Sequence, residues 1–116
     1  MQTNSRAINV HLGSELKARW IAYCDDLGKT PGAALKEAIE QQLGRVEFDT
    51  ERKKYRQTES IREPTQRFEI LLTLSEKSAV KQRARSEQCS MQRWIIDAIR
   101  VGLTHEPQFR WRKLTR

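Results

Sequence analysis

The chain has 116 residues and a mass of 13.6 kDa, the size of one small domain. With only 5 Gly and 3 Pro it is neither collagen-like nor low-complexity, and its length argues against a large enzyme with a deep pocket. Lys and Arg number 22 against 15 Asp and Glu, a formal net charge of +7 that is typical of proteins that bind polyanions.

Sequence features of membrane, metal and cofactor proteins are missing. No stretch approaches the ~18 consecutive apolar residues of a membrane span, and residues 1–7 lack the apolar core of a signal peptide. Cys24 and Cys89 stand far apart, and His11 and His105 do not complete a metal-ligand spacing with them. We therefore expect a cytoplasmic protein with reduced cysteines, no metal or cofactor, and no membrane partner.

The first 44 residues predict a strand followed by two helices. Apolar residues alternate with small or polar ones over residues 7–12, the period of a half-buried strand. Gly13 or Ser14 stands where a helix cap belongs, and Gly28 is a natural stop for that helix. Thr30 followed by Pro31 opens a second helix that runs to residue 43.

The same order of elements recurs about sixty residues later. Residues 67–74 alternate again, and Ser75 stands at the capping position of a helix over about 76–88. Ser90 caps a last helix with an apolar stripe. The inward row of the second strand is predicted to be Phe68, Ile70, Leu72 and Leu74.

Two different offsets relate the copies. The strands match at an offset of 62, with Ile8, Val10 and Leu12 corresponding to Ile70, Leu72 and Leu74, whereas the last helices match at 60. We therefore expect a shorter first helix in the second copy. Trp20 and Trp94 lie on apolar stripes and are predicted core residues.

The segment between the copies, residues 45–66, is rich in charge and contains Pro64, which predicts a linker with a helical turn or two. Its basic run, residues 52–56, is interpreted as a solvated helix face. The chain thus divides into a first unit (6–44), a charged linker (45–66), a second unit (67–104) and a basic aromatic tail (105–116).

Neither unit is expected to fold alone, because a lone strand has no partner and two short helices cannot close a core. If the two strands pair antiparallel, their apolar rows cover four helices, and the opposite side chains form one exposed ribbon. The predicted fold class is therefore mainly α with a short β-ribbon, in which two β-α-α units form an intramolecular pseudo-dimer. Such a ribbon fits the major groove of B-DNA.

Each copy resembles a ribbon-helix-helix unit of the superfamily that includes the Arc and MetJ repressors. The resemblance rests on the alternating strand, the turn at residues 28–30 and the stripe at 38–43, and on their counterparts in the second copy. Two units in one chain are similar to tandem members such as the TraY-type relaxosome accessory proteins. The resemblance implies sequence-specific binding of double-stranded DNA, in plasmid transfer by conjugation or in transcription regulation.

In this family the outward strand residues read bases. Asn9 can pair with adenine, Glu69 can accept a hydrogen bond from cytosine N4, and Thr73 can contact a thymine methyl. The two half-ribbons differ in sequence, which predicts a non-palindromic target. The base-reading positions implied by the resemblance are Ala7, Asn9, His11, Glu69, Leu71 and Thr73.

The family also holds phosphates at the N-terminus of its second helix, where free N–H groups and the helix dipole meet an anion. The implied phosphate-binding residues, with cations near them, are Arg6, Lys29, Thr30, Gly32, Arg67, Ser90, Met91 and Arg93. Arg6 and Arg67 stand at the strand starts, where an arginine can supply either base or backbone contacts. The tail interleaves aromatic and basic residues, and its candidate DNA contacts are Arg110, Trp111, Arg112 and Lys113.

Catalysis is not expected, because the two histidines and the two tyrosines form no cluster that nuclease or relaxase chemistry needs. The competing class is a protein-interaction adaptor or antitoxin-like module with only non-specific DNA affinity. The expected partners are double-stranded DNA and a relaxase or another DNA-processing protein. The chain is expected to be a monomeric pseudo-dimer or to self-associate further on DNA.

Overall fold

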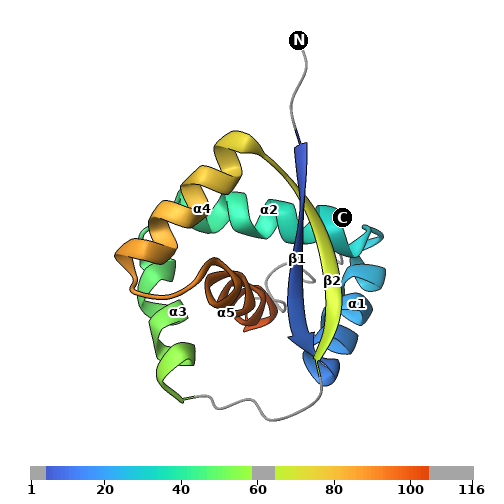
Figure 1. The fold of residues 1–116 in the computed structure, drawn as a ribbon. Helices are drawn as coiled ribbons and strands as arrows, with labels where there is room; N and C mark the ends of the chain where they lie inside the picture. The colour runs from blue at the N-terminus through green and yellow to red at the C-terminus, as the bar shows by residue number, and fades with distance from the viewer. Residues whose placement is uncertain (1–4, 59–64, 105–116) are drawn as a thin grey trace, which may run out of the picture.

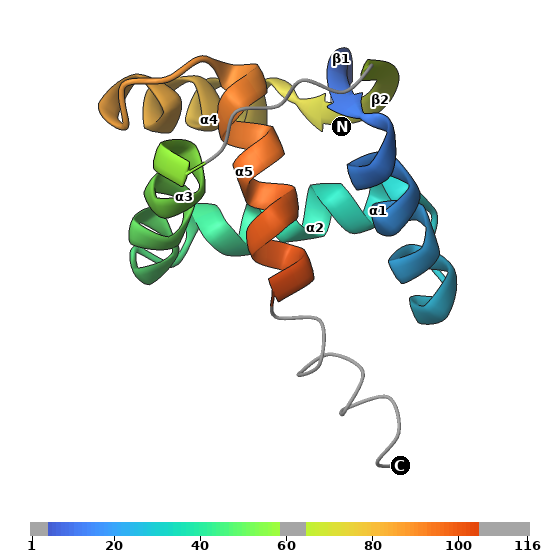
Figure 2. The same cartoon turned by 90° about the horizontal axis from the view of Figure 1, so that it is seen from below.

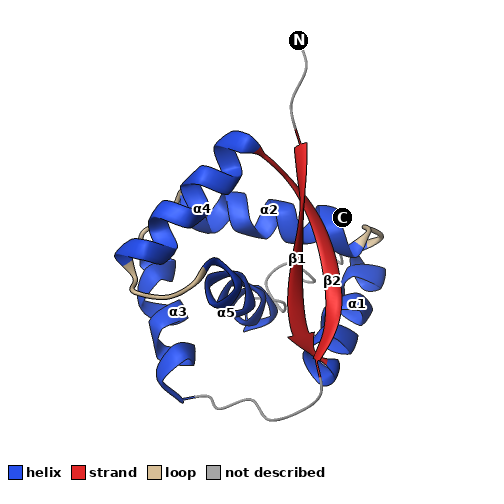
Figure 3. Ribbon diagram, in the orientation of Figure 1, coloured by secondary structure: helices blue, strands red, loops and turns tan. Residues whose placement is uncertain are grey.

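The order strand, helix, helix occurs twice in the computed structural model, which describes residues 5–58 and 65–104 (Figure 1). The predicted class is confirmed, because helices dominate and the two strands form one antiparallel sheet (Figure 3). This arrangement is consistent with a tandem ribbon-helix-helix topology. The first unit comprises β1 (Ser5–Gly13), α1 (Ser14–Leu27) and α2 (Pro31–Leu43), and the second comprises β2 (Thr65–Thr73), α4 (Leu74–Ser86) and α5 (Met91–Thr104).

A single offset of 60 residues relates the two units along their whole length, since β1, α1 and α2 each begin 60 residues before β2, α4 and α5. The offset of 62 expected for the strands is therefore wrong. Leu74 is the first residue of α4 and is 44% exposed, so the inward row of β2 ends at Leu72. The chain leaves the strand at Thr73, whose hydroxyl caps α4.

The strand register reveals a pseudo-two-fold axis. Asn9 pairs with Glu69 in the middle of the sheet, and these two positions are also equivalent at the offset of 60. The axis therefore passes between them and exchanges the two ends of the ribbon. Thus the Ala7–Leu71 pair at one end is equivalent to the His11–Arg67 pair at the other.

One core joins the two units. α2 packs against β2 and α5 against β1, so each unit's second helix supports the other unit's strand. Figure 2 shows the strands along one edge of the molecule, with α1, α2 and α5 to one side of them. Trp20 and Trp94, at 1% and 0% exposure, are core residues as predicted. The other fully buried side chains include Val10, Leu12, Leu35, Ile39, Ile70, Leu72, Val80, Ile95 and Ile99.

The segment between the units is more ordered than predicted. It contains α3 (Glu47–Thr58), a helix of 12 residues that packs against α5. The interpretation of residues 52–56 as a solvated face is wrong for Arg52, which is completely buried. No helix within residues 5–58 and 65–104 has the length and apolar character needed to cross a bilayer.

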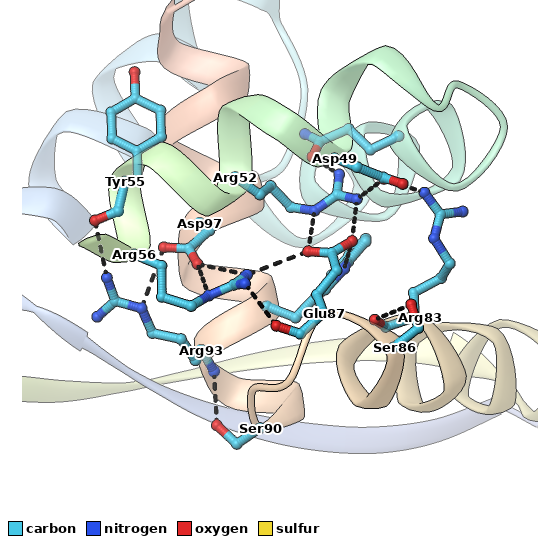
Figure 4. A network of polar contacts seen from close by, with 12 residues as sticks. Asp49, Arg52, Tyr55, Arg56, Arg83, Ser86, Glu87, Ser90, Arg93 and Asp97 are labelled. Atoms are coloured by element: carbon cyan, nitrogen blue, oxygen red, sulfur yellow. Dashed lines mark hydrogen bonds and ion pairs between the residues drawn. The ribbon is translucent and has the colours of Figure 1, made fainter. Parts of the chain in front are cut away.

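Arg52 is buried because acceptors from several elements surround its guanidinium (Figure 4). It donates to the Glu87 carboxylate at 2.7 Å and 3.3 Å, to the Gln42 side-chain oxygen at 2.8 Å, and to Asp49. It also lies 4.3 Å from the ring centre of Trp94, a cation–π contact. Multiple acceptors are what a buried guanidinium requires, since an unpaired charge in the core is strongly destabilising.

Two carboxylates of this network respond differently to burial. Burial raises the pKa of Glu87, but hydrogen bonds and charge from Arg52 and Arg56 outweigh it and hold the pKa below the usual value. Burial also raises the pKa of Asp97, and there the charges of Arg93 and Arg56 offset the effect only in part. Glu87 is therefore the principal anion that holds α3 in place.

Candidate nucleic-acid interface

The exposed face of the ribbon is formed by three opposed pairs, which we call the outer row. The pairs are Ala7–Leu71, Asn9–Glu69 and His11–Arg67, and all six residues are exposed. Five of them are outward positions that the family resemblance implied. Because opposite residues of an antiparallel pair share a face, the alternation that buries Val10 and Ile70 turns these side chains away from the core.

Arg67 belongs to this row, as the alternation predicts, and its place opposite His11 makes it a candidate base-reading residue as well as a phosphate contact. The offset of 62 matched the outward residues of β1 with Glu69, Leu71 and Thr73, whereas the register matches them with Arg67, Glu69 and Leu71. Lys17 Nζ of α1 donates to the Arg67 carbonyl oxygen at 3.1 Å, a contact that fixes the backbone of β2 at this end.

Thr73 has a structural role at the end of the ribbon. Its hydroxyl accepts from the Glu76 N–H at 3.1 Å, and the Glu76 carboxylate accepts from the Thr73 N–H at 3.0 Å. This capping box satisfies backbone donors at the start of α4. The expectation that Ser75 caps this helix is wrong, because Ser75 already lies in its first turn.

We expect Thr73→Ala to lower the free energy of unfolding by about 1 kcal/mol, because the N-cap hydroxyl is lost. Urea denaturation followed by circular dichroism measures the change. Ser75→Ala is the matched control: this serine is exposed, lies in the first turn of the same helix, and its loss should cost less than about 0.5 kcal/mol. The reverse order of the two effects would show that Ser75 is the cap.

The N-termini of α2 and α5 occupy equivalent places beneath the ribbon. The Thr30 hydroxyl accepts from the Ala33 N–H at 3.3 Å, and the Ser90 hydroxyl accepts from the Arg93 N–H at 3.1 Å, so both predicted caps are confirmed. A Cβ placed on Gly32 would lie 3.8 Å from the Glu69 carbonyl oxygen, which puts the first turn of α2 beside the middle of β2. Met91, the first residue of α5, is half-buried.

Two of the cations expected near these helix starts, Lys29 and Arg93, already have partners within the protein. Lys29 forms an ion pair with Glu37 on α2. Arg93 pairs with Asp97 at 3.3 Å and donates to the Tyr55 carbonyl oxygen of α3 at 3.3 Å. In the strand register, the backbone of Arg6 lies opposite that of Leu72. The four candidate tail contacts, residues 110–113, lie outside the described residues.

The chemistry of the outer row changes along the ribbon. One end carries Arg67 and the imidazole of His11, the centre combines Asn9 with the carboxylate of Glu69, and the other end is apolar with Ala7 and Leu71. Leu71 is 55% exposed, so its side chain offers apolar surface to a partner. The row therefore provides hydrogen-bond donors at one end, a donor–acceptor pair at its centre, and methyl groups at the other end.

No candidate metal cluster of three or more His, Cys, Asp and Glu side chains occurs within residues 5–58 and 65–104. In those residues, the outer row and the two helix starts are thus the features that carry the predicted site. No family model, curated protein or solved structure matches the chain.

Proposed function

We propose that this chain is a tandem ribbon-helix-helix protein that binds double-stranded DNA sequence-specifically by inserting β1 and β2 into the major groove. The observation that carries the proposal is the exposed outer row with the start of a capped helix from each unit on either side of one pseudo-two-fold axis. A two-stranded ribbon has dimensions that the major groove admits.

Phosphate binding is assigned to the helix starts and to the overall charge. The first turns of α2 and α5 present backbone N–H groups and the positive end of a helix dipole, which favour an anion. The formal net charge of +7 adds long-range attraction to a polyanion. Because Lys29 and Arg93 are engaged in ion pairs, the backbone groups at Gly32 and Met91 are the stronger candidates for direct phosphate contact.

Base reading is assigned to the outer row. Arg67 is suited to a bidentate contact with guanine, Asn9 to adenine, and Glu69 to the amino group of cytosine. Leu71 and Ala7 supply apolar contact with thymine methyl groups at the opposite end. Because the two ends differ chemically, the preferred DNA site is asymmetric.

The biological setting is proposed by analogy with the tandem members of the family. We propose a cytoplasmic relaxosome accessory factor in plasmid transfer, working beside a relaxase, or a transcriptional regulator. The pseudo-dimer is complete within one chain, so binding to a single site needs no second subunit.

Selection from a pool of random DNA duplexes at about 0.15 M salt tests the proposal, because non-specific phosphate binding is already weakened there. The expected result is enrichment of one short asymmetric motif. Retention of duplexes without enrichment would reduce the ribbon to a backbone binder. Absence of retention would contradict DNA binding and favour the adaptor function.

A further inference from the structure

A cavity of about 380 Å³ lies between α1, α2 and the C-terminal end of α5, and Arg45 and Phe48 at the start of α3 also line it. Its lining from the first unit includes apolar, aromatic and acidic side chains, and Gly102 of α5 lies at its edge. Four of its lining residues are Tyr23, Leu27, Ala34 and Glu37.

The cavity is the pseudo-symmetric counterpart of the α3 binding site. At the offset of 60, its four lining residues correspond to Arg83, Glu87, Trp94 and Asp97, each of which holds α3. Asp49 pairs with Arg83, Arg52 contacts both Glu87 and Trp94, and Arg56 pairs with Asp97 at 3.1 Å. Gln42, which binds Arg52, corresponds to Gly102.

The segment that corresponds to α3 in the second unit is residues 107–116. α3 begins four residues after α2 ends, and the same offset places its counterpart directly beyond α5, which ends at Thr104. The two segments share three basic positions, since Arg52, Lys53 and Arg56 recur as Arg112, Lys113 and Arg116. The correspondence in sequence therefore extends beyond the two β-α-α units.

We propose that residues 105–116 of this chain bind in the cavity, as α3 binds on the other side of the pseudo-two-fold axis. At two corresponding pairs of positions, both residues change and the contact stays favourable. The pair that corresponds to the ion pair Asp49–Arg83 is Phe109 and Tyr23, so contact between two aromatic rings replaces an ion pair. The pair Arg56–Asp97 becomes Arg116 opposite Glu37, which preserves the charges.

The cavity lining also differs from the α3 site in where its large side chains stand, since Trp20 lines the cavity and corresponds to Val80 in the second unit. Ala34 stands where Trp94 fills the other side, and the segment brings the larger Trp111 where α3 has Glu51. Leu27 stands at the position of Glu87, so the cavity offers Arg112 no carboxylate there. The aliphatic part of the Arg112 side chain covers Leu27, and its guanidinium stays in water. Apolar contact thus replaces the ion network, and the segment is held less tightly than α3.

Hydrogen exchange of the full chain without DNA, at low micromolar concentration, tests the proposal. We expect the amides of residues 108–116 to exchange about tenfold or more slowly than in a free peptide of that sequence. Ala34→Trp, which fills the cavity, should remove this protection while the amides of α5 stay protected.

A surface variant keeps the test valid if Ala34→Trp fails to fold. Glu37→Lys should reduce the protection of residues 108–116 severalfold, because it repels Arg116, and Glu37 is exposed, so folding is retained. Glu40→Lys makes the same charge change one turn along α2, outside the cavity lining, and should leave the protection unchanged.

Three results would overturn the proposal. Exchange as fast as in the free peptide would show that the cavity has no intramolecular occupant. Protection that appears only when duplex DNA is added would assign the segment to DNA instead. Protection that rises with protein concentration would show that the segment binds a second copy of the chain.

Discussion

Glu87→Ala is expected to lower the free energy of unfolding by about 3–5 kcal/mol, because it leaves a buried guanidinium without its main anion. The Glu87 and Arg52 side chains are only 2% and 0% exposed, so water cannot replace the lost partner. The same substitution removes acceptors for Arg56 and for the Trp94 indole N–H. Urea denaturation at neutral pH, followed by circular dichroism, measures the loss.

Glu47→Ala is the matched control for this prediction. Glu47 also lies on the chain segment between the two units and pairs with Arg45, but their side chains are 64% and 52% exposed. An exposed ion pair contributes little, so a loss below about 0.5 kcal/mol is expected. Similar losses for the two variants would contradict the conclusion that Glu87 anchors α3.

Arg67→Ala is expected to weaken binding to the selected duplex by about 1–3 kcal/mol, roughly fivefold to 150-fold in Kd. The arginine lies in the outer row, where a bidentate contact with one guanine accounts for the loss. The variant should also lose its preference for guanine at that position of the site. Fluorescence anisotropy with the selected duplex and with single base-pair variants of it measures both effects.

Lys53→Ala controls for general electrostatics. It removes the same charge from an exposed position on α3, across the molecule from the ribbon (Figure 1). Its effect should be small and equal for all duplexes, because only non-specific attraction changes. If both variants weaken binding equally and without regard to sequence, Arg67 does not read a base.

Much of the fold could be predicted because its signals are local. The alternation in β1 and β2, the caps at Thr30 and Ser90, and the apolar stripes of the helices each depend on neighbours within a few residues. α3 could not be predicted in the same way. Its central residue, Arg52, looks like a solvated cation until Glu87, 35 positions later, is brought beside it.

The candidate site was predictable to the extent that strand periodicity specifies a face. All six residues of the outer row lie on the face that the alternation predicts to be outward, although the alternation does not decide whether Arg67 contacts a base or the DNA backbone. Thr73 shows the limit of this signal, because the same alternation assigns it to the outer face and a local hydrogen bond recruits its hydroxyl for α4. Capping decides the role of Thr73, and it is not visible in the period of two.

The axis between Asn9 and Glu69 relates two halves that are encoded separately. In a dimer of identical chains every substitution appears at both ends of the ribbon, but here Ala7 and Arg67 can change independently. A chain bound to an asymmetric DNA site would consequently have one preferred orientation on it. Because α3 and residues 105–116 differ in sequence, a neighbouring protein would meet a different surface on each side of the axis, and the order of assembly would follow from the orientation of the site.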